Sequence, residues 1–400
     1  MVEIDDRLAR RNALVLAGAQ AFGAASPPIV VSLGGIVGVW LAPDKALATL
    51  PVSLFNLGVA AGTIPAAMLM RHLGRRSGYV VGAVLGALAG LVAAAGIYVG
   101  AFLVFCLGTF LAGNYSSFVQ SYRFAAADGA SFAFRPRAIS FVMVGGLLAA
   151  VIGPQVAIHT RDLFPQAPFV GSFLGQAALA LIALPILSLL RPVPMPTAAQ
   201  EGGRPLWQIV RAPRFIVAVS AGTVTYALMS FVMTAAPVAM VGCGHTVGEA
   251  TLGIQWHVLA MFGPSFFTGR LINRIGRSAT TALGLVLIAS AAAVALSGLA
   301  VANFWLALVL LGVGWNFGFI GATAMVTECY RPEERAKVQA ANDFLMFGTV
   351  AIASFSSGQL LDVGGWETVN WIVFPLVALV LLMIGAQEMA TRLRDRQASA

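Results

Sequence analysis

Uncharged apolar runs of about 20 residues or more recur along the whole of this 400-residue chain, and each is long enough to cross a bilayer as one helix. Hydrophobic residues make up 59% of the sequence and charged residues only 10%. An average soluble domain is about 25% charged. The chain is therefore predicted to be an all-α membrane protein, and at roughly 30 to 35 residues for a span and its loop it has room for about a dozen helices.

The apolar runs divide into two sets of six. The first six spans are expected at 13–39, 47–70, 78–99, 101–126, 139–159 and 168–190. The second six are expected at 214–241, 249–271, 279–301, 303–328, 338–361 and 368–389. Prolines and glycines are concentrated in the interval between the sets, which predicts a linker. The expected organisation is an N-terminal six-helix bundle at 1–190, a cytoplasmic linker at 191–213 and a C-terminal six-helix bundle at 214–400, with a short interfacial helix at 206–210.

A basic Gly-Arg turn occurs twice, at 71–76 and at 269–277, and each copy separates two apolar runs. The glycines of the two turns, Gly74 and Gly276, lie 202 positions apart, which is about half the chain. This repeat indicates two pseudo-symmetric bundles, an architecture typical of carriers. Residues expected to act as conformational-switch loops are Gly74, Arg75, Arg76, Gly269, Arg274, Gly276 and Arg277.

The basic residues predict the orientation in the membrane. With alternate loops counted, 21 of the 24 lie on one side and only Lys45 and Arg161 on the other, while Arg123 falls inside a span. Lys and Arg favour cytoplasmic loops, so both termini are expected in the cytoplasm. A net charge of +8 is explained by these loops and the lipid bilayer, and no nucleic-acid partner is expected. Localisation in the bacterial inner (plasma) membrane follows.

These features resemble the major facilitator superfamily over essentially the whole chain. The family pattern between spans 2 and 3 is roughly G-x-x-x-D-R-x-G-R-R. The second copy keeps Gly269, Arg274, Gly276 and Arg277, with Asn273 in place of the acid. In the first copy Gly74, Arg75 and Arg76 match, and the departures are Ala67, Arg71 and His72. The resemblance implies alternating access by two rocking halves. In the family the acid helps to lock the inward-closed state, so its loss in both copies leaves that latch in question.

Charges inside membrane spans are costly and often functional. Arg123, Asp128, Glu328 and Asp343 are expected toward the cytoplasmic half of the molecule, as an inner gate or as a static set of salt bridges between the halves. His257 is the best candidate for proton handling because histidine titrates near neutral pH. The alternative is a neutral histidine that is hydrogen-bonded to a neighbouring helix.

Polar and aromatic residues within the spans predict a substrate cavity, because amides in lipid need partners and most should face the interior. Some of them serve only helix–helix hydrogen bonds. Few charges line the midplane, so a phosphate ester fits poorly and a neutral or weakly charged organic solute with an aromatic or apolar part fits better. The predicted substrate-binding residues are Asn56, Asn114, Tyr115, Gln255, Trp256, Trp315 and Asn316.

Enzyme and cofactor motifs are absent from the sequence, including the P-loop, H-E-x-x-H, G-x-S-x-G and any cysteine cluster. We therefore expect neither an enzyme nor a metal or cofactor site. The predicted function is secondary active transport of a small organic solute by a proton-coupled monomer. Alternatives are an uncoupled facilitator, a drug-type proton antiporter (favoured faintly by Gly153 and Pro154 in span 5) and a receptor of the same fold that does not transport.

Overall fold

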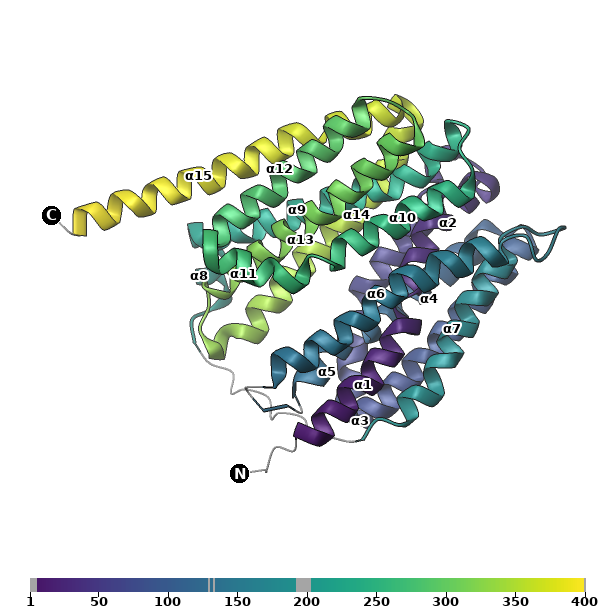
Figure 1. The fold of residues 1–400 in the computed structure, drawn as a ribbon, viewed down its shortest axis with the longest axis horizontal. Helices are drawn as coiled ribbons and strands as arrows, with labels where there is room; N and C mark the ends of the chain where they lie inside the picture. The colour runs from purple at the N-terminus through teal and green to yellow at the C-terminus, as the bar shows by residue number, and fades with distance from the viewer. Residues whose placement is uncertain (1–5, 129, 132–133, 192–202, 399–400) are drawn as a thin grey trace.

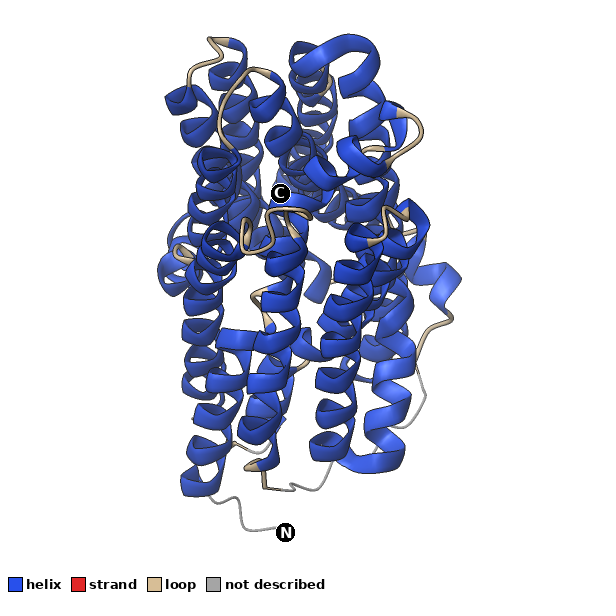
Figure 2. Cartoon of the chain, turned by 90° about the vertical axis from the view of Figure 1, so that its right-hand side faces the viewer, coloured by secondary structure: helices blue, strands red, loops and turns tan. Residues whose placement is uncertain are grey.

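The computed structural model describes residues 6–128, 130–131, 134–191 and 203–398. Every regular element within these residues is a helix, as the sequence predicts (Figure 2). The chain starts in one helical bundle and crosses to a second, so that the purple-to-teal helices and the green-to-yellow helices form separate groups (Figure 1). Residues 192–202 of the expected linker lie outside the described residues.

The described residues of the first half form seven α-helices and one short 3₁₀ helix. They are α1 (Asp6–Gly23), α2 (Ser26–Leu41), η1 (Lys45–Leu47), α3 (Leu50–Tyr98), α4 (Phe102–Gln120), α5 (Tyr122–Asp128), α6 (Arg135–Thr160) and α7 (Val170–Ser188). The first predicted span is divided into α1 and α2, just before Pro27 and Pro28. Proline lacks a backbone N–H, which explains why the helix is interrupted at this point.

The second half begins with the short helix α8 (Leu206–Val210), where the sequence predicts one. The remaining elements are α9 (Pro213–Gly242), α10 (Val247–Phe262), α11 (Ser265–Ile275), α12 (Arg277–Leu296), α13 (Val301–Thr327), η2 (Pro332–Glu334), α14 (Arg335–Trp371) and α15 (Val373–Ala398). The chain ends at α1 and α15 both lie toward the left of Figure 1, and we call this end of the molecule the terminus side. The opposite end, with η1 and the loops at 161–169 and 243–246, is the far side.

Nine helical stretches of the described residues are long and apolar enough to cross a membrane. Two of them, Lys45–Tyr98 and Lys337–Thr391, each contain two spans because Gly74 and Gly365 break the helix. The predicted eighth span is divided into α10 and α11, which are 16 and 11 residues long and therefore too short to be counted. The nine stretches, one additional span in each of these two and the divided eighth span together make the twelve spans that the sequence predicts.

The two Gly-Arg turns have the same backbone conformation. Gly74 has φ 79° and ψ 160°, and Gly276 has φ 87° and ψ 164°. Residues with a Cβ rarely adopt this region, so glycine permits the reversal between consecutive spans. Each turn reverses the chain after the second span of its half, which supports the predicted pseudo-symmetry of the two halves.

Small residues let neighbouring helices approach closely inside each bundle. A Cβ at Gly58 of α3 would overlap the Phe110 carbonyl oxygen of α4, and one at Gly113 of α4 would overlap the Phe55 carbonyl oxygen of α3. In lipid, such close contact supplies the van der Waals attraction that replaces a hydrophobic driving force. These bundles therefore pack as rigid units, and their mutual arrangement defines the candidate site.

Candidate functional site

Side-chain hydrogen bonds join the two halves from the far side toward the middle of the molecule. The Gln155 Nε2 donates to the Gln255 Oε1 at 2.9 Å and links α6 to α10. The Asn56 Nδ2 donates to the Ser230 Oγ at 3.4 Å and links α3 to α9. The predicted substrate residues Asn56 and Gln255 therefore both lie at the boundary between the halves, where each bonds the opposite half.

Apolar contacts cover the same part of the boundary. Val31 and Val52 of the first half belong to the buried core of the second half, and Phe347 of the second half packs against the core of the first. The Ser53 Oγ donates to the Ser354 Oγ at 3.3 Å beside these contacts. Because polar and apolar contacts combine here, the far side of the boundary is closed.

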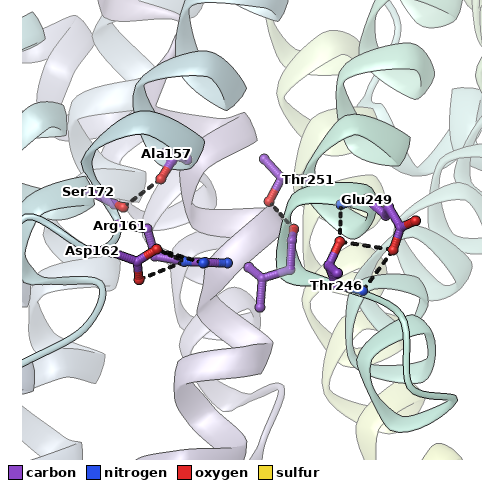
Figure 3. A network of polar contacts seen from close by, with 8 residues as sticks. Ala157, Arg161, Asp162, Ser172, Thr246, Glu249 and Thr251 are labelled. Carbon is purple, nitrogen blue, oxygen red and sulfur yellow. Dashed lines mark hydrogen bonds and ion pairs between the residues drawn. The ribbon is translucent and has the colours of Figure 1, made fainter. Parts of the chain in front are cut away.

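Figure 3 shows how the second half fixes the start of α10 at this closed end. The Thr246 Oγ1 accepts a hydrogen bond from the Glu249 backbone N–H at 3.1 Å, and the Glu249 carboxylate accepts from the Thr246 N–H at 2.8 Å. This reciprocal pair is a capping box, which satisfies two backbone donors at once. It holds the beginning of the helix that presents Gln255 to the first half.

The first half fixes its own far-side loop in the same view (Figure 3). The Ser172 Oγ donates to the Ala157 carbonyl at 2.9 Å and ties α7 to α6. Arg161 pairs with its neighbour Asp162 at 2.6 Å, and this hydrogen-bonded guanidinium lowers the pKa of the Asp162 carboxyl. Both contacts stay inside the first half, so the loops are held locally and the halves meet through the helices.

Five aromatic side chains of the second half form what we call the aromatic cluster. The Tyr226 ring meets Trp315 and Phe319 edge-on at 5.4 Å between centroids, and Phe347 at 5.9 Å. Trp315 and Phe319 stack at 5.0 Å with nearly parallel planes, and Phe262 approaches Trp315 edge-on at 6.2 Å. Tyr226, Phe319 and Phe347 are only half-buried, so parts of these rings remain accessible.

Trp315 supplies a buried polar group to this cluster. Its side chain is 7% exposed, and its indole N–H has no hydrogen-bond partner among the described residues. A buried donor without a partner is costly, and such groups in native proteins commonly await a water or a ligand. The predicted substrate residue Trp315 therefore combines a stacking face with a free donor.

Arg123 of the first half lies beside the aromatic cluster of the second. Its guanidinium interacts electrostatically with the Asp343 carboxyl and the Tyr226 hydroxyl, both on the opposite half. Its side chain is exposed, and its guanidinium carbon lies 4.8 Å from the centroid of the Phe124 ring. No direct ion pair joins Arg123 to Asp343 within the described residues; the Asp343 Oδ1 accepts from the Asn342 Nδ2 at 3.1 Å. The two charges therefore belong to opposite halves and interact electrostatically.

The other two predicted charges pair inside their own halves. Arg75 of the first Gly-Arg turn forms an ion pair with Asp128, and Arg277 of the second forms one with Glu328. Each pair joins the turn after the second span of its half to the end of the fourth. The acid that the family pattern places in the turn is lost, but a carboxylate from the fourth span meets the turn in both halves.

His257 lies inside the second half and is fully buried between α10 and α13. Its Nδ1 lies 2.7 Å from the Leu308 carbonyl oxygen, and its Nε2 has no partner among the described residues. Since a carbonyl can only accept, Nδ1 carries the proton in this contact. This geometry corresponds to the alternative interpretation of a neutral histidine that links two helices.

Four further predicted substrate residues form no side-chain hydrogen bond to the opposite half within the described residues. Tyr115 is fully buried in the core of the first half, and Asn114 bonds the Phe110 carbonyl of its own helix at 3.0 Å. Asn316 is fully buried and ties α13 to α10 through the Met261 carbonyl at 2.6 Å. Trp256 is 44% exposed. These positions favour a role in helix packing over a role in lining a cavity. The spacing of residues in the sequence does not distinguish the two roles.

The linker is anchored at both of its described ends. At the first, the Asn12 side chain donates to the Arg191 carbonyl at 3.0 Å and accepts from the Arg191 N–H at 3.1 Å. At the second, the Glu334 carboxylate accepts from Arg204 through its backbone N–H at 2.7 Å and its guanidinium at 2.8 Å, and from the Arg331 N–H at 2.9 Å. Bonding to Arg204 holds the pKa of Glu334 well below its usual range. The contact could not be predicted from the sequence, because Arg204 and Glu334 are 130 residues apart.

Two pockets at the ends of the molecule are separate from the aromatic cluster. One of about 460 Å³ lies on the terminus side beside Arg214, Arg277 and Glu328. The other, about 600 Å³, lies on the far side beside Trp40 and Trp366. We place the candidate site at the cluster nonetheless, because that is where charged, aromatic and unpartnered polar groups from both halves converge.

Comparison with known proteins identifies the family. A family model described as Major Facilitator Superfamily matches residues 12–316 and 246–396. The chain belongs to the major facilitator superfamily. The riboflavin transporter RfnT of Brucella anthropi is 63% identical over 381 residues, covering 94% of this chain and 96% of that protein. The uncharacterized MFS-type transporter YdeG of Bacillus subtilis is 30% identical over 398 residues, covering 94% of this chain and 91% of its own length.

Solved structures agree on the fold of this superfamily member. The nucleoside transporter NupG superposes with a TM-score of 0.68 and covers 95% of this chain and 98% of its own. A point mutant of NupG superposes with a TM-score of 0.72 and covers 95% of this chain and 99% of its own; both are 15% identical. Twelve spans in two pseudo-symmetric six-helix bundles are the arrangement that the sequence predicts. The protein is an integral membrane transporter of a small molecule and not an enzyme.

Proposed function

We propose that this protein carries riboflavin or a closely related flavin across the membrane by alternating access. The observation that carries the proposal is the 63% identity to a riboflavin transporter, which extends over nearly the full length of both proteins. Riboflavin is uncharged and has a flat three-ring system with a sugar-alcohol chain. It belongs to the class of neutral, partly aromatic solutes that the sequence favours.

The aromatic cluster supports this proposal. Flat heterocycles bind to aromatic side chains by stacking, and Tyr226 and Phe319 offer partly accessible rings beside the boundary between the halves. Arg123 and Asp343, which interact electrostatically across the boundary, are of opposite sign. Such a pair suits an uncharged solute that both donates and accepts hydrogen bonds, and it suits an anionic phosphate ester poorly.

The transport cycle that we propose starts from a state closed on the far side and open toward the terminus side. Hydrogen bonds such as Gln155–Gln255 hold the far side closed. We assign the terminus side to the cytoplasm because 21 of the 24 basic residues are expected there. In the opposite state these bonds break, and the ion pairs of Arg75 and Arg277 adjust as the terminus side closes.

We further propose that transport is coupled to protons and that Asp343 is the first group to test as the carrier. Asp343 lies at the boundary, where its surroundings change as the halves rock, whereas His257 is enclosed within one half. An uncoupled facilitator is the alternative. Collapse of the pH gradient distinguishes them, since it stops accumulation only in a proton-coupled transporter.

Uptake of labelled riboflavin tests the proposed function. The assay uses cells without a riboflavin uptake system of their own, with and without the protein. We expect uptake that saturates and is inhibited by excess unlabelled riboflavin but not by ribitol. Equal uptake in both kinds of cell would contradict the proposal. A receptor that does not transport would bind riboflavin and leave uptake unchanged.

A further inference from the structure

We propose that Tyr226, Trp315 and Phe319 form the surface on which the flat ring system of the solute stacks, and that Arg123 binds the carbonyl edge of that ring from the opposite half. This inference rests on the proposed function, because it takes the solute to be a flavin. It assigns the recognition of the ring to particular residues of both halves. The sugar-alcohol chain then contributes less to binding than the ring does.

The aromatic surface is built from three rings that pack against one another. Trp315 and Phe319 lie four residues apart on α13, so their rings share one face of the helix and stack at 5.0 Å. Tyr226 of α9 packs edge-on against both rings. The packing of each ring against the others limits its movement, so a flat solute meets a surface that is already ordered.

The indole N–H of Trp315 offers this surface a hydrogen-bond donor. The Trp315 indole N–H is buried without a hydrogen-bond partner among the described residues, inside a membrane span where water is scarce. An acceptor that reaches this N–H would relieve a cost of desolvation that the empty protein bears. A flavin ring carries nitrogen and carbonyl acceptors on its edges. An aliphatic solute without such an acceptor would leave the donor unsatisfied.

Arg123 and Asp343 are charged groups of opposite sign that complement the polar edge of a flavin ring. Arg123 has only donors and ionised Asp343 has only acceptors. The pyrimidine edge of a flavin presents two carbonyl oxygens with an N–H between them. That edge can therefore accept from Arg123 and donate to Asp343, which lie on opposite halves and interact electrostatically.

A contact between the bound ring and Arg123 would affect the transport cycle, because Arg123 and the aromatic surface lie on different halves. Arg123 belongs to the first half, whereas the aromatic surface belongs entirely to the second. A ring stacked on the second half and hydrogen-bonded to Arg123 therefore links the two halves. A ligand shifts a conformational equilibrium only through such differential contacts, so the bound ring favours closure of the terminus side.

Riboflavin fluorescence provides the test, because stacking on aromatic residues quenches it. Purified full-length protein in detergent is titrated with riboflavin, and bound riboflavin is then challenged with lumichrome, which has the ring system without the ribityl chain, or with ribitol. We expect quenching, competition by lumichrome and no competition by ribitol. If ribitol competes and lumichrome does not, the chain and not the ring is recognised, and the inference is overturned.

Variants locate the ring contact. Y226A and F319A each remove a ring, and both are expected to weaken riboflavin binding by about tenfold and to reduce the quenching. Y226F keeps the ring and should keep the quenching. W315F retains the stacking face and loses only the N–H donor, so it should weaken binding with quenching preserved. R123Q should weaken binding more than R123K, which keeps the charge.

Matched controls separate these effects from general damage. W371F changes an exposed tryptophan of the same half, and R161Q changes a far-side arginine that is paired with Asp162. Both should bind as the wild type does, and every variant is compared only where its melting temperature and elution profile match the wild type. Wild-type affinity and quenching in Y226A and F319A would overturn the inference and leave the proposed function standing. A wild-type protein that neither binds nor transports riboflavin would overturn both.

Discussion

Arg75 and Asp128 form an ion pair that joins the first Gly-Arg turn to the end of the fourth span, and Arg277 and Glu328 repeat it in the second half. The glycines of the two turns share one unusual backbone conformation. Both halves thus hold a positive turn against an acid at the same place in their topology. Since the pairs lie inside their halves, they position the turns and do not themselves bridge the boundary.

Breaking these ion pairs should slow transport and leave stability almost unchanged. D128N and E328Q each remove one carboxylate, and partly exposed ion pairs contribute about 0.2–1 kcal/mol to stability. The expected result is a transport rate lowered severalfold with a melting temperature near that of the wild type. The charge-swapped variant R75D/D128R should recover part of the rate. D162N, which breaks a far-side pair, is the control and should transport normally.

Removing the charge of Asp343 should abolish transport. In D343N the amide keeps the shape of the side chain, but it no longer balances Arg123 across the boundary. We expect wild-type expression and folding, with riboflavin uptake reduced to background. Unchanged uptake would remove Asp343 from both the gate and the proton pathway.

Replacing His257 should affect stability more than coupling. In H257A a buried ring is lost and the Leu308 carbonyl loses its donor, which should cost about 1–3 kcal/mol. H257Q can still donate to that carbonyl and should be closer to the wild type in melting temperature. Both variants should keep the pH dependence of uptake per folded molecule. A normal melting temperature with lost pH dependence would instead make His257 the proton carrier.

Cross-linking the far side should trap the transporter. In a background without the native cysteines, Q155C and Q255C place two thiols where the wild-type amides are 2.9 Å apart. A short bifunctional thiol reagent should link them, stop uptake and leave riboflavin binding from the terminus side intact. The pair Q155C and W256C is the control, since the Trp256 side chain is exposed and Gln155 bonds Gln255 instead. Free transport after complete cross-linking would show that this contact need not open.

The linker anchor should depend on pH in a defined direction. Bonding to Arg204 lowers the pKa of Glu334 in the folded protein, so its stabilising effect is full above the unfolded pKa of about 4.5 and is lost as pH falls toward the folded pKa. E334Q should therefore melt a few degrees below the wild type at neutral pH. That difference should shrink as the pH falls below about 4.5. A difference that does not change with pH would mean that Glu334 acts by its shape alone.

Much of the fold could be predicted because the bilayer imposes it. Apolar runs of sufficient length identify the spans, and the repeated glycines at 74 and 276 identify the relationship between the halves. The sequence could not specify which face of a span meets the other half. Asn114 and Tyr115 are neighbours in a span, like Gln255 and Trp256, yet in the second pair only Gln255 reaches the opposite half.

The candidate site could be predicted only in part, for a similar reason. Trp315 and the charges Arg123 and Asp343 are conspicuous in their spans, and the structure brings them to one region. Phe319 and Phe347 were missed because phenylalanine is common in lipid-facing helices, and only tertiary packing brings these two beside Tyr226. The spacing of four residues between Trp315 and Phe319 was the one available signal, since it places both rings on one face of a helix.

Counterflow of riboflavin in proteoliposomes tests the central claim most directly. Vesicles that contain the purified protein are loaded with unlabelled riboflavin and diluted into a trace of labelled riboflavin. A site exposed to one side at a time exchanges label for unlabelled solute, so the account predicts that label inside rises above its final equilibrium value and then declines. Label that rises only to equilibrium, or that never enters, would contradict it.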